Sequence, residues 1–250
     1  MPAVKELMLK MADDALVIGH RNSEWTGLGP ILEEDIAFSS MAQDKIGHAL
    51  ALYTMLHEQF EEAAPDQLAF HRSEKEFRCC HLVELPIGEY DFSVARHFLF
   101  DHAEAIRYEL LTNSSYEPLG RLARKIKGEL KYHVLQANSW MTRLGRGSEE
   151  SHARMQSALN YAMPYTSGMF EETDSESELI AQAIFPGEKQ LQEFWEERIR
   201  EQLAKSNLEF PEVKPADLHL GGRKGYHTEH LHPLLEEMSQ VFKLEEGVEW

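Results

Sequence analysis

The sequence has 250 residues, 42% of them hydrophobic, which is enough for a packed core. It carries 25 Lys and Arg against 43 Asp and Glu, giving a formal net charge of −18. So acidic a chain is a poor candidate for general binding of nucleic acid or of anionic membranes, and a basic partner protein suits it better. We therefore expect neither nucleic acid nor a membrane among its partners.

The cysteine content and the first segment of the chain predict a cytoplasmic protein. Cys79 and Cys80 are adjacent and are the two cysteines of the chain, too few for a disulfide framework, so we expect buried, inert thiols. The acids Asp13 and Asp14 interrupt the first segment, which is unlike a signal peptide. No stretch reaches the roughly 18 apolar residues that a membrane span requires.

Helical periodicity begins at the start of the chain. Apolar residues at helical spacing predict a first helix over residues 4–25. Pro30 opens a second, long helix that ends before Pro65. Apolar residues lie on two faces of this helix, one of which includes Ile36 and Leu50, so we expect it to be central in a helical bundle.

The rest of the chain is also predicted to be helical. After an irregular stretch with one short helix at 66–72, helices are expected at 91–114, 118–144, from 149 with a bend near Pro164, at 187–205 and at 228–241. No strand-like alternation of comparable length occurs. The sequence therefore predicts one all-α domain, 1–250, with two antiparallel helix pairs at its centre.

Several acids of these helices resemble the ligands of a di-iron site. In such a bundle two helices each supply one carboxylate, and two others each supply Glu-x-x-His. Here the histidine follows the acid after four residues, whereas the motif places it after three. The positions are Asp44, Gly47 and His48 in the second helix, Asp101 in the third, and Glu129, Tyr132 and His133 in the fourth.

Two interpretations of these positions remain open. One is a metal site with an atypical ligand set: Asp44, His48, Asp101, Glu129 and His133. The other is a metal-free interior in which the acids pair with basic or hydrogen-bonding side chains. We favour the second, and predict degenerate metal-site positions with no catalytic residue and no metal in this chain.

Four long blocks carry a family resemblance. They are MADDALVIGHRNSEWTGLGPILEEDIAFSSMAQDKIGHA, FLFDHAEAIRYELL, KGELKYHVLQANSWMTRLGRGSEESHARMQSALNYAMPYT and GGRKGYHTEHLHPLLEEM. In order and content they resemble the non-catalytic C subunits of bacterial phenylacetyl-CoA 1,2-epoxidase. The likeness covers about residues 12–238. His48 and the two cysteines depart from the pattern expected of this family.

The resemblance implies a ferritin-like bundle with additional C-terminal helices and no metal cofactor of its own. It implies a stable complex with a catalytic A subunit that holds a di-iron centre and epoxidises the ring of phenylacetyl-CoA. A reductase delivering electrons from NADPH, further subunits and a homodimer of the isolated chain are also expected. Whether the chain is itself an enzyme stays open. The alternatives are a di-iron oxygenase active by itself and a metal-free bundle that binds acyl-CoA.

Two further groups of residues are candidate binding sites. Arg121, Arg124 and Lys125 lie in a basic helical segment that could contact a phosphate of CoA, although a solvated face with salt bridges is the simpler interpretation. His227, His230 and His232 have spacings that could hold zinc. No further ligand set is evident near them, and a docking segment explains them better.

Overall fold

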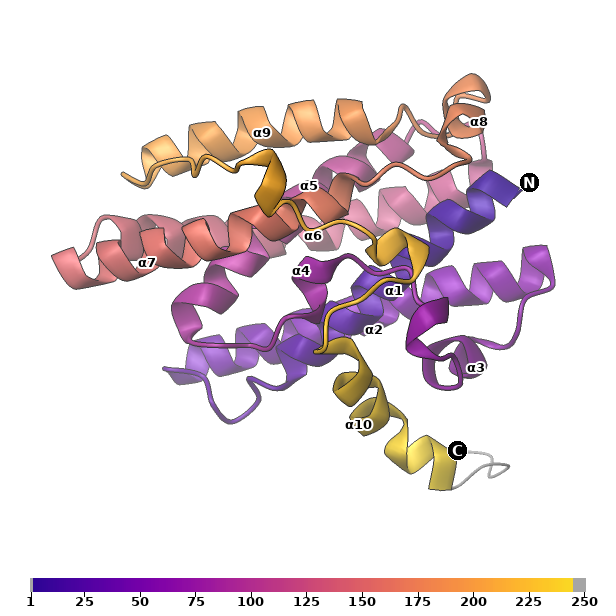
Figure 1. The fold of residues 1–250 in the computed structure, drawn as a ribbon, viewed down its shortest axis with the longest axis horizontal. Helices are drawn as coiled ribbons and strands as arrows, with labels where there is room; N and C mark the ends of the chain where they lie inside the picture. The colour runs from indigo at the N-terminus through magenta and orange to yellow at the C-terminus, as the bar shows by residue number, and fades with distance from the viewer. Residues whose placement is uncertain (1, 245–250) are drawn as a thin grey trace. The chain divides into compact units, whose positions relative to one another are not determined.

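The computed structural model describes residues 2–244, and within these it contains helices and no strands (Figure 1). The α-helices are α1 (Pro2–Ser23), α2 (Leu32–Phe60), α3 (Pro65–Phe70), α4 (His81–Glu84), α5 (Tyr90–Leu111), α6 (Glu117–Gly145), α7 (Glu149–Ala162), α8 (Glu176–Ala181), α9 (Glu188–Lys205) and α10 (Leu231–Leu244). The 3-10 helices are η1 (Glu74–Glu76), η2 (Met163–Phe170), η3 (Pro215–Asp217) and η4 (Gly222–Lys224). This confirms the all-α, ferritin-like prediction.

The chain divides into two compact units. Unit 1 comprises Ile87–Leu220 together with the first residues of α1, and unit 2 comprises Lys5–Pro86 together with the segment that begins at Gly221. The chain passes through each unit more than once, so this division does not cut the sequence into consecutive domains. That residues 1–250 form a single domain stays a prediction.

Each unit contains one of the expected antiparallel pairs of long helices. In unit 1, His102 of α5 contacts Asn138 of α6 at 2.8 Å, and Glu109 contacts Lys127 at 3.1 Å, so numbers rise along α5 as they fall along α6. Around this pair lie α7, η2 and α9 (Figure 1). The buried Trp195 of α9 donates from its indole Nε1 to the carbonyl of Leu99, 2.9 Å away, and so fixes α9 against α5.

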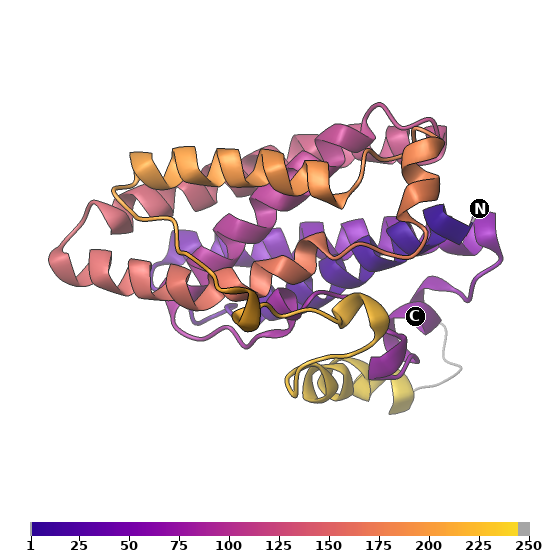
Figure 2. The same cartoon turned by 45° about the horizontal axis from the view of Figure 1, so that its top comes forward.

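Unit 2 holds α2 and most of α1. The Tyr53 hydroxyl lies 2.6 Å from Asp13, and a Cβ added at Gly19 would meet Ile46 at 3.0 Å, so these helices also run antiparallel. The short helix α3 lies beside α10 (Figure 2). Phe70 of α3 packs on Phe242 of α10, with ring centroids 5.2 Å apart.

One prediction about α2 is wrong. The face that includes Ile36 and Leu50 is exposed, whereas Ala49, Leu52, Tyr53 and Leu56 are buried. The exposed apolar residues form a line that we call the α2 stripe: Leu32, Ile36, Ile46 and Leu50, with 70%, 60%, 37% and 52% of their surface exposed. They lie within about 80° of one another around the helix axis and extend over about 27 Å. In this chain α2 therefore has one buried face.

Within residues 2–244, no helix combines the length and the mean hydropathy that a membrane span requires.

Stability in acid should depend on His20, near the end of α1. Burial lowers its pKa from 6.5 to about 4, even though the end of a helix favours a cation. The unfolded chain then binds the proton first, so stability is complete above pH 6.5 and falls as the pH drops toward 4. Denaturation in urea should show a loss of about 2 kcal/mol at pH 5 relative to pH 7. His20→Gln should remove that part of the loss, and an unchanged pH dependence would contradict the assignment.

Candidate functional site

The interior polar group of unit 1 is centred on Asp101. One carboxylate oxygen lies 2.8 Å from Nδ1 of His97, one turn earlier on α5, and the other lies 4.0 Å from Nδ1 of His133 on α6. All three side chains are buried. The structure therefore places two of the predicted positions, Asp101 and His133, near each other, and adds His97, which the sequence pattern of acids did not indicate. The spacing of four residues between His97 and Asp101 was the available signal.

The histidines on α2 and α6 show which positions face inward. His48 and His133 are buried, and the residues three positions before them are Lys45 and Leu130, both fully buried. A Glu-x-x-His motif ending at these histidines needs a glutamate at each of those two positions. A leucine offers no ligand atom, and a protonated lysine offers only hydrogen-bond donors.

The sequence had assigned the broken motif to other positions, and the structure corrects this. Tyr132 is 71% exposed, and a Cβ added at Gly47 would meet nothing within 4 Å. Neither position points in the same direction as the buried histidine that follows it, because successive residues of a helix project about 100° apart around its axis. Asp44 and Glu129 are only half-buried. Of the seven predicted positions, Asp101, His48 and His133 are buried.

In unit 2, each of the two acids of α1 forms an ion pair with an arginine. Asp13 accepts hydrogen bonds from Tyr53, from Nη1 and Nη2 of Arg72 and from the backbone of Arg78, at 2.5–3.0 Å. Burial and the Asp13 carboxylate raise the pKa of Tyr53, which keeps the phenol protonated as a donor.

Asp14 is satisfied in the same way. It is paired with Arg223 through two contacts of 2.8 Å, and its Oδ1 also accepts from the backbone of Cys80. These carboxylates are neutralised without a metal.

The basic segment of α6 forms surface ion pairs. Arg124 lies 2.8 Å from Glu117, which Arg121 approaches at 3.9 Å, while Lys125 is exposed. A surface cavity of about 430 Å³ in unit 1 is lined by Ile106, Leu110 and Phe194 together with three glutamates and one arginine: Glu109, Glu197, Glu201 and Arg198. This lining is unfavourable for the phosphates of CoA. Contact of Arg121, Arg124 and Lys125 with a phosphate stays a prediction.

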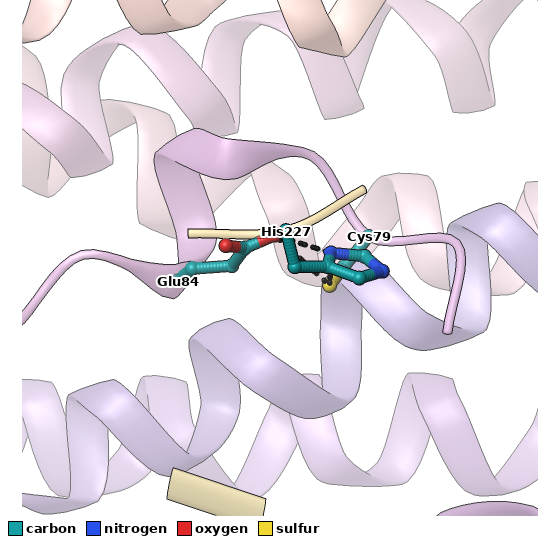
Figure 3. Close-up of side chains that lie close together, drawn as sticks. All are labelled: Cys79, Glu84 and His227. Carbon is teal, nitrogen blue, oxygen red and sulfur yellow. Dashed lines mark hydrogen bonds and ion pairs between the residues drawn. The ribbon is translucent and has the colours of Figure 1, made fainter. Parts of the chain in front are cut away.

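The three C-terminal histidines have different partners. His232 is exposed near Glu74 and Glu236, at 3.6 and 3.5 Å, and His230 lies 3.9 Å from Glu229. His227 instead points into unit 2, where its Nδ1 lies 2.7 Å from Glu84 and 3.9 Å from the sulfur of Cys79 (Figure 3). Sequence spacing could not reveal this cluster, because its members come from residues 79–84 and 227.

The cysteines are buried, as expected. Burial and the neighbouring Glu84 carboxylate raise the pKa of the Cys79 thiol, and burial and Asp14 raise that of Cys80. Thiols that stay protonated are poor nucleophiles.

Comparison with known proteins agrees with the resemblance seen in the sequence. Residues 1–250 match the family model described as "Phenylacetic acid catabolic protein". The chain is 31% identical, over 242 residues, to the C subunit of the 1,2-phenylacetyl-CoA epoxidase of Escherichia coli (strain K12), and the match covers 97% of each chain. Identity at this level over nearly the full length, together with the match of the whole chain to the family model, shows that the chain belongs to the phenylacetic acid catabolic protein family.

Proposed function

We propose that this chain is the non-catalytic C subunit of a phenylacetyl-CoA epoxidase and acts in the cytoplasm in aerobic phenylacetate degradation. Its partner is a catalytic A subunit whose di-iron centre inserts one oxygen atom of O₂ into the aromatic ring, with electrons that a reductase takes from NADPH. The match to the C subunit of the Escherichia coli epoxidase supports this assignment. The role of this chain is to bind the catalytic subunit and stabilise its helices.

One observation carries the non-catalytic role. Lys45 and Leu130 occupy the positions, three residues before His48 and His133, where a di-iron site requires glutamates. The residues present therefore do not fit a di-iron centre. Asp13 and Asp14, bound to Arg72 and Arg223, support the same interpretation.

The α2 stripe supports binding to a partner subunit. Four large aliphatic side chains lie in a line on one helix, with much of their surface exposed to water. Each such side chain gains about 1.5–3 kcal/mol when it is fully buried. Exposed large aliphatic side chains gathered on one helix face are typical of a protein interface. We assign the α2 stripe to contact with the catalytic subunit.

The iron content of the purified chain tests the proposal. We expect far less than one iron per chain when the protein is expressed alone, without a tag, in iron-replete medium and measured by plasma mass spectrometry. The catalytic subunit, purified in parallel, is the positive control. About two irons per chain, lost in His133→Ala, would overturn the non-catalytic role and favour an oxygenase with an atypical ligand set.

A further inference from the structure

A second polar cluster in unit 2 lies outside the degenerate di-iron positions. Within residues 2–244, Cys79, Glu84 and His227 are the one group of three potential ligands whose donor atoms all lie within 4.8 Å of one another. Their side chains point toward a common centre (Figure 3). We propose that this cluster is a binding site for one zinc ion.

The spacing of the three donor atoms suits a tetrahedral metal. Zinc bound to a thiolate, an imidazole and a carboxylate holds the sulfur about 3.6 Å from each of the other two atoms, and those two about 3.3 Å apart. Here Sγ of Cys79 lies 3.7 Å from Oε1 of Glu84 and 3.9 Å from Nδ1 of His227. The nitrogen and oxygen lie 2.7 Å apart, a hydrogen-bond distance that must open by about 0.6 Å.

The atoms behind the cluster are arranged as around a bound metal. Nε2 of His227, on the far side of the ring, lies 3.1 Å from the carbonyl of Phe77, which orients the imidazole. Oε2 of Glu84 accepts from the backbone N–H and the hydroxyl of Thr228, at 2.8 and 2.7 Å, which leaves Oε1 for the metal. Outer hydrogen bonds of this kind orient metal ligands and tune their basicity.

Close backbone approach brings the two chain segments together. A Cβ added at Gly222 would meet the carbonyl oxygen of Cys79 at 2.2 Å, and one at Gly225 would meet that of Lys75 at 2.3 Å. Only glycine permits such approaches, and Gly225 also has a φ of +81°. A metal here would join the segment at 79–84 to the C-terminal segment at His227.

The charge of the cluster is unchanged when zinc binds. Without metal, one proton lies between Nδ1 and Oε1, because the carbonyl of Phe77 requires another on Nε2, and the thiol of Cys79 holds a third. Zn²⁺ replaces the first and the third, so one Zn²⁺ enters and two protons leave. This avoids an uncompensated charge in a site whose side chains are almost fully buried. Sulfur, nitrogen and oxygen ligands together suit Zn²⁺.

Co²⁺ can report the coordination directly. The untagged full-length chain, treated with chelator and kept reduced, should bind about one Co²⁺ with a thiolate-to-cobalt charge-transfer band, and Zn²⁺ should displace it. Cys79→Ala should abolish the band. Cys80→Ala, which changes the neighbouring buried thiol, is the matched control and should keep it. A band that survives in Cys79→Ala, or no stoichiometric binding by the unmodified chain, would overturn the site.

A second measurement needs no variant. Titration calorimetry with Zn²⁺ in two buffers of different ionisation enthalpy should give about two protons released per ion. Zinc should also raise the thermal midpoint of the unmodified chain. A release near zero would contradict the ligand set. The outcome is independent of the proposed function, because metal held here is lost in Cys79→Ala and kept in His133→Ala.

Discussion

Glu188→Ala should lower the free energy of unfolding by about 3–5 kcal/mol, one of the largest effects of a single substitution expected in this chain. Glu188 is fully buried at the start of α9 and pairs with Arg107 of α5 through both carboxylate oxygens, one contact being 2.9 Å. Removing the carboxylate leaves the buried guanidinium with the carbonyl of Met169, 3.0 Å away, and with the ring of Phe185, whose centroid is 5.5 Å from its central carbon. Urea denaturation, with the midpoint and slope analysed together, measures the loss.

Two controls separate burial from pairing. Glu201→Ala removes an acid from an exposed pair with Lys205 on the same helix, and should cost far less than Glu188→Ala because solvent screens the pair. The double variant Arg107→Met, Glu188→Leu removes both charges and should be more stable than Glu188→Ala alone. If Glu188→Ala and Glu201→Ala cost the same, the buried pair does not hold α9 in place.

The long helices could be predicted because their periodicity is local. The range predicted as 118–144 corresponds to α6, Glu117–Gly145, and the helix predicted from 149 is α7, which Ser148 caps by accepting from the backbone of Ser151. The four-residue helix α4 was missed because so short a segment has no periodicity. Its Glu84 is held by Thr228, 144 positions later in the chain. Contacts between residues so far apart in the chain cannot be predicted from the spacing of residues within one segment.

The interior positions were misassigned because the prediction began from acids. Counting three residues forward from Asp44 and Glu129 leads to Gly47 and Tyr132. These residues project about 100° around the helix axis from the buried histidines that follow them. Beginning from His48 and counting back three residues would have reached Lys45, whose full burial is the informative feature. Charged residues are almost never fully buried unless they are paired, so sequence alone gives little reason to place a lysine inside.

The face of α2 that includes Ile36 and Leu50 was wrongly predicted to be buried. Sequence alone does not distinguish an apolar surface buried within the chain from one buried by a partner. Ile36 and Leu50 are apolar at helical spacing, which the isolated sequence attributes to a core. In the chain they are exposed. The same pattern therefore fits a helix whose second apolar face is covered only in a complex.

Ile36→Asp combined with Leu50→Asp should weaken binding of the catalytic subunit at least about tenfold in Kd, and epoxidation should fall in parallel when the concentrations of both proteins are held fixed. Because 60% and 52% of the surface of these residues is exposed in the free chain, their burial in the complex contributes about 1.5–3 kcal/mol together, and tenfold in Kd corresponds to about 1.4 kcal/mol. Because both side chains are exposed in this chain, its own fold should be unaffected. Titration of the catalytic subunit with the variant, followed by calorimetry, measures Kd, and circular dichroism checks the helices. The matched control is Leu135→Asp, because Leu135 is a similarly large and exposed aliphatic residue on α6. Loss of binding in Leu135→Asp with the α2 stripe variant unaffected would place the interface on α6 instead, since only the face that becomes buried in the complex is sensitive to an introduced charge.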